Sequence, residues 1–337
     1  MSDTYTKRLL SSDSHIVEPA DLWTTRMDKK WREKAPRIEA LDETGDYIVI
    51  DGLHPRPLAF EGPMQDLKAQ GMEIPTPKGY RYSDNRPGAW DPHERLKDQD
   101  IDGVSGEVIY PGVRLTLVRA PDPEYLYACC RVYNDWLAEF CKPYPDRLKG
   151  VGMLPCRGPI EWAVAETERC AKLGLVSVML PAWVDDRPYN LPDWDPLWAA
   201  MQDMGVVASM HIGGRDPFGR AHGPGAGGII IGLVKFEMND TLQRLIWGGA
   251  PVRFPKLKWA LVESGIGWIG SVLEFMDHWW QDHKGWMEPR LPETPSVYFR
   301  RQFYATFEDD RAGVLTREIM GTENLMWGSD YPHTEGV

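Results

Sequence analysis

The chain alternates between short β-rich apolar runs and longer segments of helical character. The β-rich runs predict strands at 8–15, 103–112, 150–156, 176–183, 206–214, 257–264, 303–310 and 325–333. Each run is followed by a segment in which apolar residues recur at helical spacing, so the pattern is one of alternation rather than of internal repeats.

The segments between these strands predict helices. The clearest cover 123–141, 159–174 and 195–205, with a further helix-like stretch at 91–100, and two of them end at glycine, as helices often do. Eight strand–helix alternations in a chain of 337 residues are typical of a (β/α)8 barrel. We therefore expect an α/β fold of the TIM-barrel type, built as a single domain over residues 1–337.

Two features depart from a plain barrel. After the first predicted strand comes a stretch rich in Pro and Gly, and within it GDYIVIDGLHPRPLAF (45–60) has a strand-turn-strand pattern. We interpret residues at about 24–90 as an inserted lobe over the barrel mouth. The sequence also stops soon after the eighth predicted strand, so we expect no eighth helix. Either another chain covers that groove, or the sequence is a shortened version of a longer parent.

Composition and charge exclude several classes of function. The formal charge of −12 is spread along the chain without a Lys/Arg cluster, so nucleic-acid binding is not expected. The chain lacks both a long apolar stretch and the apolar core of a signal peptide, so we expect no membrane association and a cytoplasmic location. Five cysteines without a CxxC pair argue against a disulfide framework and against a thiolate zinc site.

Carboxylates and histidines stand at the ends of several predicted strands. Residues i and i+2 of a strand point to the same face, so the first strand aims Asp13 and His15 at one point. Active sites of barrels lie at the carboxyl ends of the strands, where such side chains converge in space. The residues at these ends are Asp13, His15, His211, Glu263, Asp330 and His333.

Several motifs taken together resemble one family. They read DSHIVEPADLW (13–23), SMHIGG (209–214), ALVESGIGWIGSVLEFMDHW (260–279), YATFEDD (304–310) and LMWGSDYPHTEG (325–336). Their combination resembles the amidohydrolase-related metal-dependent TIM-barrel enzymes, the branch that includes aminocarboxymuconate semialdehyde decarboxylase and the resorcylate-type decarboxylases. The resemblance spans nearly the whole predicted barrel.

The resemblance implies a divalent metal held by the strand-one pair, a strand-five histidine and a strand-eight aspartate. The chain departs from the commonest family pattern, His-x-His, because Asp13 stands first, and it carries Glu263 where many relatives have a strand-six histidine. Both changes make the expected site more anionic. The residues that match the metal-binding positions are Asp13, His15, His211 and Asp330.

The residue types predict the metal and its chemistry. Imidazole nitrogen and carboxylate oxygen suit divalent Zn, Mn and Fe, and we expect Zn²⁺ first, with Mn²⁺ or Fe²⁺ as alternatives. Such an ion lowers the pKa of a bound water or polarises a substrate oxygen. We assign catalytic roles to Asp330, His211 and Glu263, with Asp330 relaying a proton between water and substrate.

Other residues are candidates for supporting roles. Glu18, Glu263 and His333 could hold a second metal or stand behind the ligands of the first. Each also has a structural alternative, because Glu18 and Glu263 could cap the turn or helix that follows them and His333 could be an ordinary loop residue. The candidate substrate-binding residues are Arg114, Arg119, Trp23, Trp327 and Tyr331.

Three classes of function fit these residues, and fold analogy alone does not choose between them. The first is a metal-dependent hydrolase or non-oxidative decarboxylase that cleaves a C–N or C–C bond of a small carboxylated compound, aromatic or unsaturated. The second is a dinuclear Fe or Mn oxygenase on the same barrel. The third is a non-catalytic subunit that partners an active homologue. The enzymatic classes imply a small-molecule substrate, and we expect a homo- or hetero-oligomer.

Overall fold

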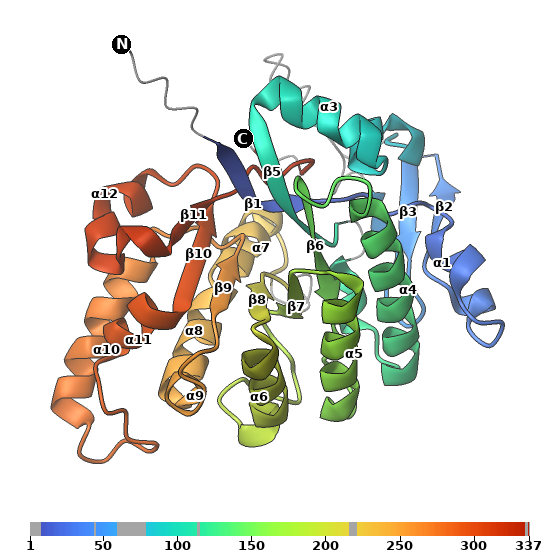
Figure 1. The fold of residues 1–337 in the computed structure, drawn as a ribbon. Helices are drawn as coiled ribbons and strands as arrows, with labels where there is room; N and C mark the ends of the chain where they lie inside the picture. The colour runs from blue at the N-terminus through green and yellow to red at the C-terminus, as the bar shows by residue number, and fades with distance from the viewer. Residues whose placement is uncertain are drawn as a thin grey trace, which may run out of the picture.

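The chain forms a barrel of parallel strands surrounded by helices. A computed structural model describes residues 8–43, 45–58, 79–112, 115–215, 221–333 and 336. The eight strands of the barrel within these residues are, in sheet order, β1 (Leu9–His15), β5 (Val104–Tyr110), β6 (Leu148–Met153), β7 (Ser177–Pro181), β8 (Val207–His211), β9 (Trp259–Val262), β10 (Phe303–Phe307) and β11 (Leu325–Trp327). Seven of these strands fall within predicted runs and β6 begins two residues before its run at 150–156, so the TIM-barrel prediction is confirmed (Figure 1).

The barrel closes where the chain beyond β11 meets β1. The backbone amide of Asp330 donates to the carbonyl of Asp13 at 2.9 Å, and that of His15 donates to the carbonyl of Tyr331 at 2.5 Å. The Ser11 hydroxyl accepts a further hydrogen bond from the backbone amide of Ser329 at 2.8 Å. Figure 1 shows β1 and β11 side by side. Because β11 is short, most of the hydrogen bonds of this seam lie beyond its end.

Helices pack around the strands, and local signals set their ends. The helices are α1 (Leu22–Arg26), α3 (Pro92–Asp102), α4 (Pro123–Cys141), α5 (Ile160–Leu173), α6 (Asp195–Met204), α7 (Ala226–Lys235), α8 (Glu237–Trp247), α9 (Ala250–Arg253), α10 (Ile269–His283), α11 (Pro295–Gln302) and α12 (Arg311–Met320). The Asp91 carboxylate caps α3 by accepting from the amides of His93 and Glu94. Gly103 ends the same helix in the left-handed conformation, which glycine adopts without strain.

Short 3₁₀ turns join these elements. They are η1 (Arg32–Lys34), η3 (Tyr82–Asp84), η4 (Pro87–Ala89), η5 (Leu115–Arg119), η6 (Pro192–Trp194) and η7 (Thr322–Asn324). Of these, η5 follows β5 at the carboxyl end of the barrel and so borders its mouth.

A small sheet lies between β1 and α3 in the sequence. It contains β2 (Arg37–Asp42), β3 (Gly45–Val49) and β4 (Arg56–Pro57), paired antiparallel in that order. The lobe expected after strand one therefore has a sheet of its own. Its limits at about 24–90 and the single-domain division stay predictions, and residues 59–78 lie outside the described chain. Beyond β11, the described residues form no further helix.

The core of the barrel is apolar and rich in aromatic rings. Every residue of β7 and of β9 is buried. A run of rings crosses from α6 to the barrel, with Trp198 6.1 Å from Trp259 and Trp259 5.0 Å from Phe303 between ring centroids. These rings contribute large buried areas, as expected of a tryptophan-rich chain. Among the described helices, none is both long enough and apolar enough to cross a membrane.

The packing of Gly112, just after β5, generates a stability prediction. A Cβ atom at Gly112 would lie 1.8 Å from the carbonyl oxygen of Ile16 and 2.8 Å from its carbonyl carbon. Because this contact is with backbone, we expect Gly112→Ala to lower the free energy of unfolding by about 1–3 kcal/mol, measured by urea denaturation. The matched control is Gly228→Ala in α7, where an added Cβ meets no atom within 4 Å. Equal losses in the two variants would contradict this reading of the packing.

Candidate metal centre

Five ligand-type side chains meet at the carboxyl ends of the strands. Asp13 and His15 lie in β1, His211 is the last residue of β8, Glu263 follows β9 directly, and Asp330 follows β11. The strands are parallel, so these positions share one rim of the barrel. Their exposed fractions are 0% for Asp13, His15 and His211, 6% for Glu263 and 1% for Asp330. The convergence expected from the sequence is therefore present in the structure.

Two of these residues have an unfavourable backbone conformation. In the described chain, the non-glycine residues with positive φ are Glu263, at 61°, and Asp330, at 55°. Hydrogen bonds hold both in place, because the Glu263 amide donates to the Thr306 hydroxyl at 2.8 Å and the Asp330 amide donates to the Asp13 carbonyl at 2.9 Å. Such conformations cost roughly 1–3 kcal/mol each and cluster at functional sites.

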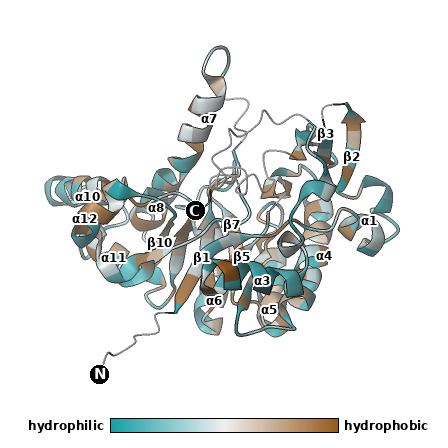
Figure 2. Cartoon of the chain, turned by 90° about the horizontal axis from the view of Figure 1, so that it is seen from above, coloured by the Kyte–Doolittle hydropathy of each residue, from teal (hydrophilic) through white to brown (hydrophobic). Residues whose placement is uncertain are grey.

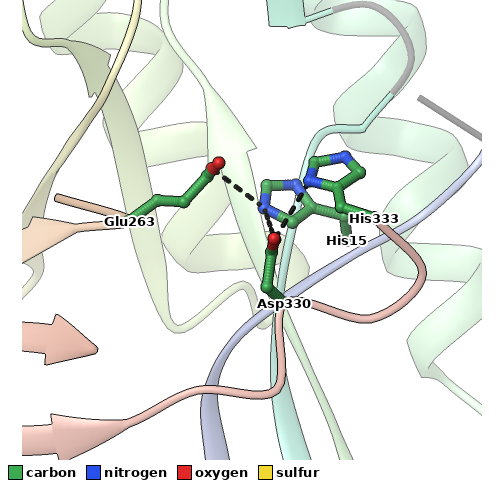
Figure 3. A group of neighbouring side chains, drawn as sticks. All are labelled: His15, Glu263, Asp330 and His333. Carbon is green, nitrogen blue, oxygen red and sulfur yellow. Dashed lines mark hydrogen bonds and ion pairs between the residues drawn. The ribbon is translucent and has the colours of Figure 1, made fainter. Parts of the chain in front are cut away.

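His15 is the centre of the group. Its Nε2 atom lies 3.3 Å from Asp330 Oδ1, 3.4 Å from Glu263 Oε2 and 3.5 Å from Asp13 Oδ1. Figure 3 shows Glu263 and Asp330 pointing at this imidazole from two sides. The ring of His333 stacks on that of His15, with 4.0 Å between the centroids, and His333 Nδ1 lies 3.0 Å from Asp330 Oδ1.

His211 joins the group through Glu263, because its Nε2 atom lies 3.1 Å from Glu263 Oε2. Ligand atoms within 4.8 Å of one another define two overlapping sets that could hold a metal ion. One set is His15, Glu263, Asp330 and His333, and the other is Asp13, His15 and His211.

Hydrogen bonds on the far side of the rings set the tautomers of both central histidines. His15 Nδ1 lies 2.7 Å from the carbonyl oxygen of Pro111, and His211 Nδ1 lies 3.0 Å from that of Ile212. A carbonyl only accepts, so each Nδ1 carries the proton and donates it. In the neutral rings this leaves the lone pair of each Nε2 directed at the carboxylates. The same arrangement orients metal-ligating histidines in general.

The facing atoms are therefore acceptors without donors. Asp13 Oδ1, His15 Nε2, His211 Nε2 and Glu263 Oε2 are buried and have no hydrogen-bond partner among the described residues. Acceptors packed this closely repel one another unless a proton or a metal ion lies between them. Ligands about 2.1 Å from one ion lie about 3.0–3.4 Å from each other, close to the separations around His15 and His211. The residues present thus fit a divalent metal ion.

The same contacts shift the pKa values of the group. Burial alone would lower the pKa of His15, but Asp330 and Glu263 hold it well above its usual range. Burial would raise the pKa of Glu263, but His15 and His211 hold it well below. Burial raises the pKa of Asp13 well above its usual value, against the opposing effect of His15. The group thus favours positive charge at its centre.

A further carboxylate near the group was not among the residues selected from the sequence. Glu308 directly follows β10, its side chain is 10% exposed, and its Oε2 lies 3.3 Å from Nζ of Lys235 at the end of α7. Burial raises its pKa, Lys235 opposes the rise, and the nearby charges of Glu263 and Asp330 add to it. Helix α7 projects from the body of the molecule (Figure 2). The signal was the position of Glu308 at a strand end, within the motif YATFEDD.

Other candidates lie outside the two sets. Glu18 is buried, but its Oε1 accepts a hydrogen bond from the Gly112 amide at 3.2 Å. Trp23 belongs to the hydrophobic core, where its indole N–H donates to the carbonyl of Cys129 at 3.0 Å. Tyr331 is also mostly buried, and its hydroxyl donates to Asp98 Oδ2 at 2.7 Å. The core packing of Trp23 and the hydrogen bond of Tyr331 give both rings structural partners.

The remaining substrate-binding candidates are more scattered. Trp327 is the last residue of β11 and is partly exposed, while Arg114 lies outside the described residues. Arg119 ends η5 and lines a pocket of about 520 Å³ together with His54 and Arg56 of the β3–β4 region. The described lining of this pocket includes no member of the two metal-binding sets.

Comparison with known proteins agrees with this geometry. The family model described as Amidohydrolase matches residues 46–336. The chain belongs to the amidohydrolase family. This confirms the resemblance drawn from the motifs at the strand ends.

Curated relatives of this member of the amidohydrolase family are named as decarboxylases. It is 26% identical over 256 residues to a gamma-resorcylate decarboxylase of Rhizobium sp., covering 71% of this chain and 76% of that protein. It is 27% identical over 216 residues to a gamma-resorcylate decarboxylase of Polaromonas sp., covering 59% of this chain and 64% of that protein.

Solved structures share the fold of this amidohydrolase. An amidohydrolase of Mycobacterium avium subsp. paratuberculosis superposes with a TM-score of 0.78 at 22% identity, covering 98% of this chain and 90% of that chain. A dihydroxybenzoic acid decarboxylase of Polaromonas sp. was solved with bound manganese; its TM-score is 0.62 at 18% identity, covering 97% of this chain and 87% of that chain.

The tautomers and facing acceptors of this amidohydrolase generate a prediction about metal binding. We expect His211→Ala to weaken binding of Mn²⁺ or Zn²⁺ by on the order of 100-fold. Loss of a residue that only hydrogen-bonds to a metal ligand costs about 10–100-fold in affinity, so loss of a ligand should reach at least the upper end of that range. The fold should survive, because the barrel has its own apolar core. Titration calorimetry and circular dichroism check both parts, with His93→Ala on α3, whose ring faces Tyr144, as the control. Full metal affinity in His211→Ala would count against the assignment.

Proposed function

We propose that this amidohydrolase is a metal-dependent, non-oxidative decarboxylase of a small aromatic carboxylate. The observation that carries the proposal is the set of buried acceptor atoms that face one another around His15 and His211. The curated relatives, named as gamma-resorcylate decarboxylases, support the class of reaction. Hydrolysis of a similar carboxylated compound is the second reaction that the same site could carry out.

The ion would be held by Asp13, His15, His211 and Asp330, with Glu263 as a further oxygen donor. Three carboxylates and two imidazoles suit Mn²⁺ as well as Zn²⁺, and manganese is the ion in the solved Polaromonas relative. We retain Zn²⁺ as the alternative. When bound, the ion would polarise a substrate oxygen and offset part of the negative charge of the site.

The chain's own residues would supply the proton. Loss of CO₂ breaks a C–C bond and leaves its electron pair on the ring carbon, which must take up a proton. His333 Nδ1 lies 3.0 Å from Asp330 Oδ1, and the side chains are 13% and 1% exposed. The pair therefore leads from the partly exposed imidazole to the buried carboxylate. A proton held at His333 Nδ1 can pass to Asp330 Oδ1 and from there to the substrate.

The overlap of the two metal-binding sets favours a single ion over the dinuclear oxygenase. Both sets contain His15, and its Nδ1 already donates to a carbonyl. Its Nε2 lone pair can bind one ion only, so the two sets would share that ion and form parts of a single metal site. Glu18, the residue that would favour a second ion, belongs to neither set.

Metal stoichiometry tests this preference. We expect one tightly bound ion per chain in wild type and also in Glu18→Gln, because Glu18 belongs to neither metal-binding set and its Oε1 accepts a hydrogen bond from the Gly112 amide. Metal analysis of protein purified without chelator measures the ratio. Two ions in wild type and one in Glu18→Gln would favour the oxygenase instead.

The reaction itself is tested with the metal-loaded chain and a panel of hydroxybenzoates, with gamma-resorcylate first. We expect CO₂ release by wild type and a loss of about 10²–10⁴-fold in kcat for Asp330→Asn, which removes the proton acceptor. Metal content is measured alongside, because Asp330 is also a candidate ligand. Asp282→Asn, an exposed position on α10, is the control. No CO₂ from any member of the panel would contradict the proposed decarboxylase.

A further inference from the structure

Helix α3 carries a buried arginine that the proposed chemistry does not use. Arg95 is 1% exposed, and its Nε donates to Glu107 Oε2 of β5 at 2.7 Å, where the side chain of Glu107 is 4% exposed. Buried ion pairs are weak evidence of stabilisation, because apolar residues of similar volume are often as good. The geometry around Arg95 gives a more specific reason for its presence.

Arg95 contacts both sides of the barrel seam. Its Nη1 donates to the carbonyl oxygen of His15 at 2.9 Å. Its guanidinium carbon lies 4.2 Å from the ring centroid of Tyr331, the neighbour of Asp330. The His15 amide also donates to the Tyr331 carbonyl at 2.5 Å. One side chain thus touches the residue that carries the central imidazole and the residue beside the strand-eight carboxylate.

Tyr331 is fixed in turn by a second residue of α3. Its hydroxyl donates to Asp98 Oδ2 at 2.7 Å, and Arg86 Nη2 donates to Asp98 Oδ1 at 2.6 Å. The space here is tight, since a Cβ on Gly88 would lie 2.0 Å from Asp98 Oδ2 and 3.0 Å from the Tyr331 hydroxyl. Helix α3 therefore holds the chain on each side of the seam with side chains one turn apart.

We infer that Arg95 is a positioning residue, which sets the separation of His15 and Asp330 and thereby the affinity of the candidate metal centre. The inference rests on the proposed function. The seam needs a residue that fixes its two sides because β11 is short. The candidate metal ligand Asp330 lies beyond the end of this strand, in a loop, and has a positive φ. An arginine suits this position because its planar fork donates in two directions while its face stacks on an aromatic ring. A lysine offers the charge without the fork or the flat face.

The test measures metal affinity without turnover. Arg95→Met should raise the Kd for Mn²⁺ by about 10–100-fold, the usual effect of removing a residue behind metal ligands, and Arg95→Lys should fall between it and wild type. The electron paramagnetic resonance spectrum of the bound Mn²⁺ should change in Arg95→Met, because the ligands lose their fixed spacing. The matched control is Arg169→Met on α5, which breaks a partly buried ion-pair network with Glu166 and Asp135.

The control separates positioning from general stability. We expect Arg169→Met to lower the free energy of unfolding while the Kd and the spectrum stay as in wild type. Should Arg95→Met fail to fold, Tyr331→Phe keeps the ring, removes the bond to Asp98 and should still raise the Kd. Variants at Arg95 and Tyr331 that bind Mn²⁺ as wild type does would overturn the inference, as would a wild type that binds no Mn²⁺. A wild type that binds Mn²⁺ but releases no CO₂ would contradict the proposed decarboxylase alone.

Discussion

The mutual repulsion of lone pairs at the carboxyl ends of the strands is the constraint on which the site depends. Two imidazoles present Nε2 to carboxylate oxygens because their Nδ1 atoms already donate to the carbonyls of Pro111 and Ile212. Asp13 Oδ1, Glu263 Oε2 and the two Nε2 atoms have no hydrogen-bond partner among the described residues, so their close approach is stable only around positive charge. The backbone at Glu263 and Asp330 keeps a positive φ, which directs both carboxylates at His15. The polar contacts of α3 hold the chain on both sides of the seam, against the repulsion between these ligand atoms.

The fold can be predicted from the sequence because each parallel strand of a barrel has a recognisable local pattern of apolar residues. β7 and β9 are buried along their whole length and so read as continuous apolar runs between helical segments. The strand-end residues were also predictable, since a carboxylate or histidine after an apolar run in a barrel faces the mouth. Strand-end position alone indicates six such residues. The resemblance to the family singles out Asp13, His15, His211 and Asp330 among them as metal ligands, and the structure brings these four together.

The rest of the site depends on side-chain directions that the pattern does not contain. Glu308 directly follows a strand as Glu263 does, yet only the fold shows that its mostly buried carboxylate lies near Glu263 and Asp330. Trp23 and Tyr331 were candidates for the pocket wall because large rings line pockets. The structure gives the first a core partner on α4 and the second a partner on α3. Composition predicts that an aromatic ring is buried, whereas its neighbours depend on tertiary packing.

The left-handed backbone at Glu263 and Asp330 has a consequence for how this protein would respond to selection. Glycine adopts such a conformation without strain, so replacing either residue by glycine would relieve the backbone while removing a carboxylate from the site. Selection for heat resistance alone would therefore act against these two positions, and only selection for activity would retain them. A homologue with glycine at both positions would keep the barrel but would lack two carboxylates of the site, as expected where selection for activity no longer acts.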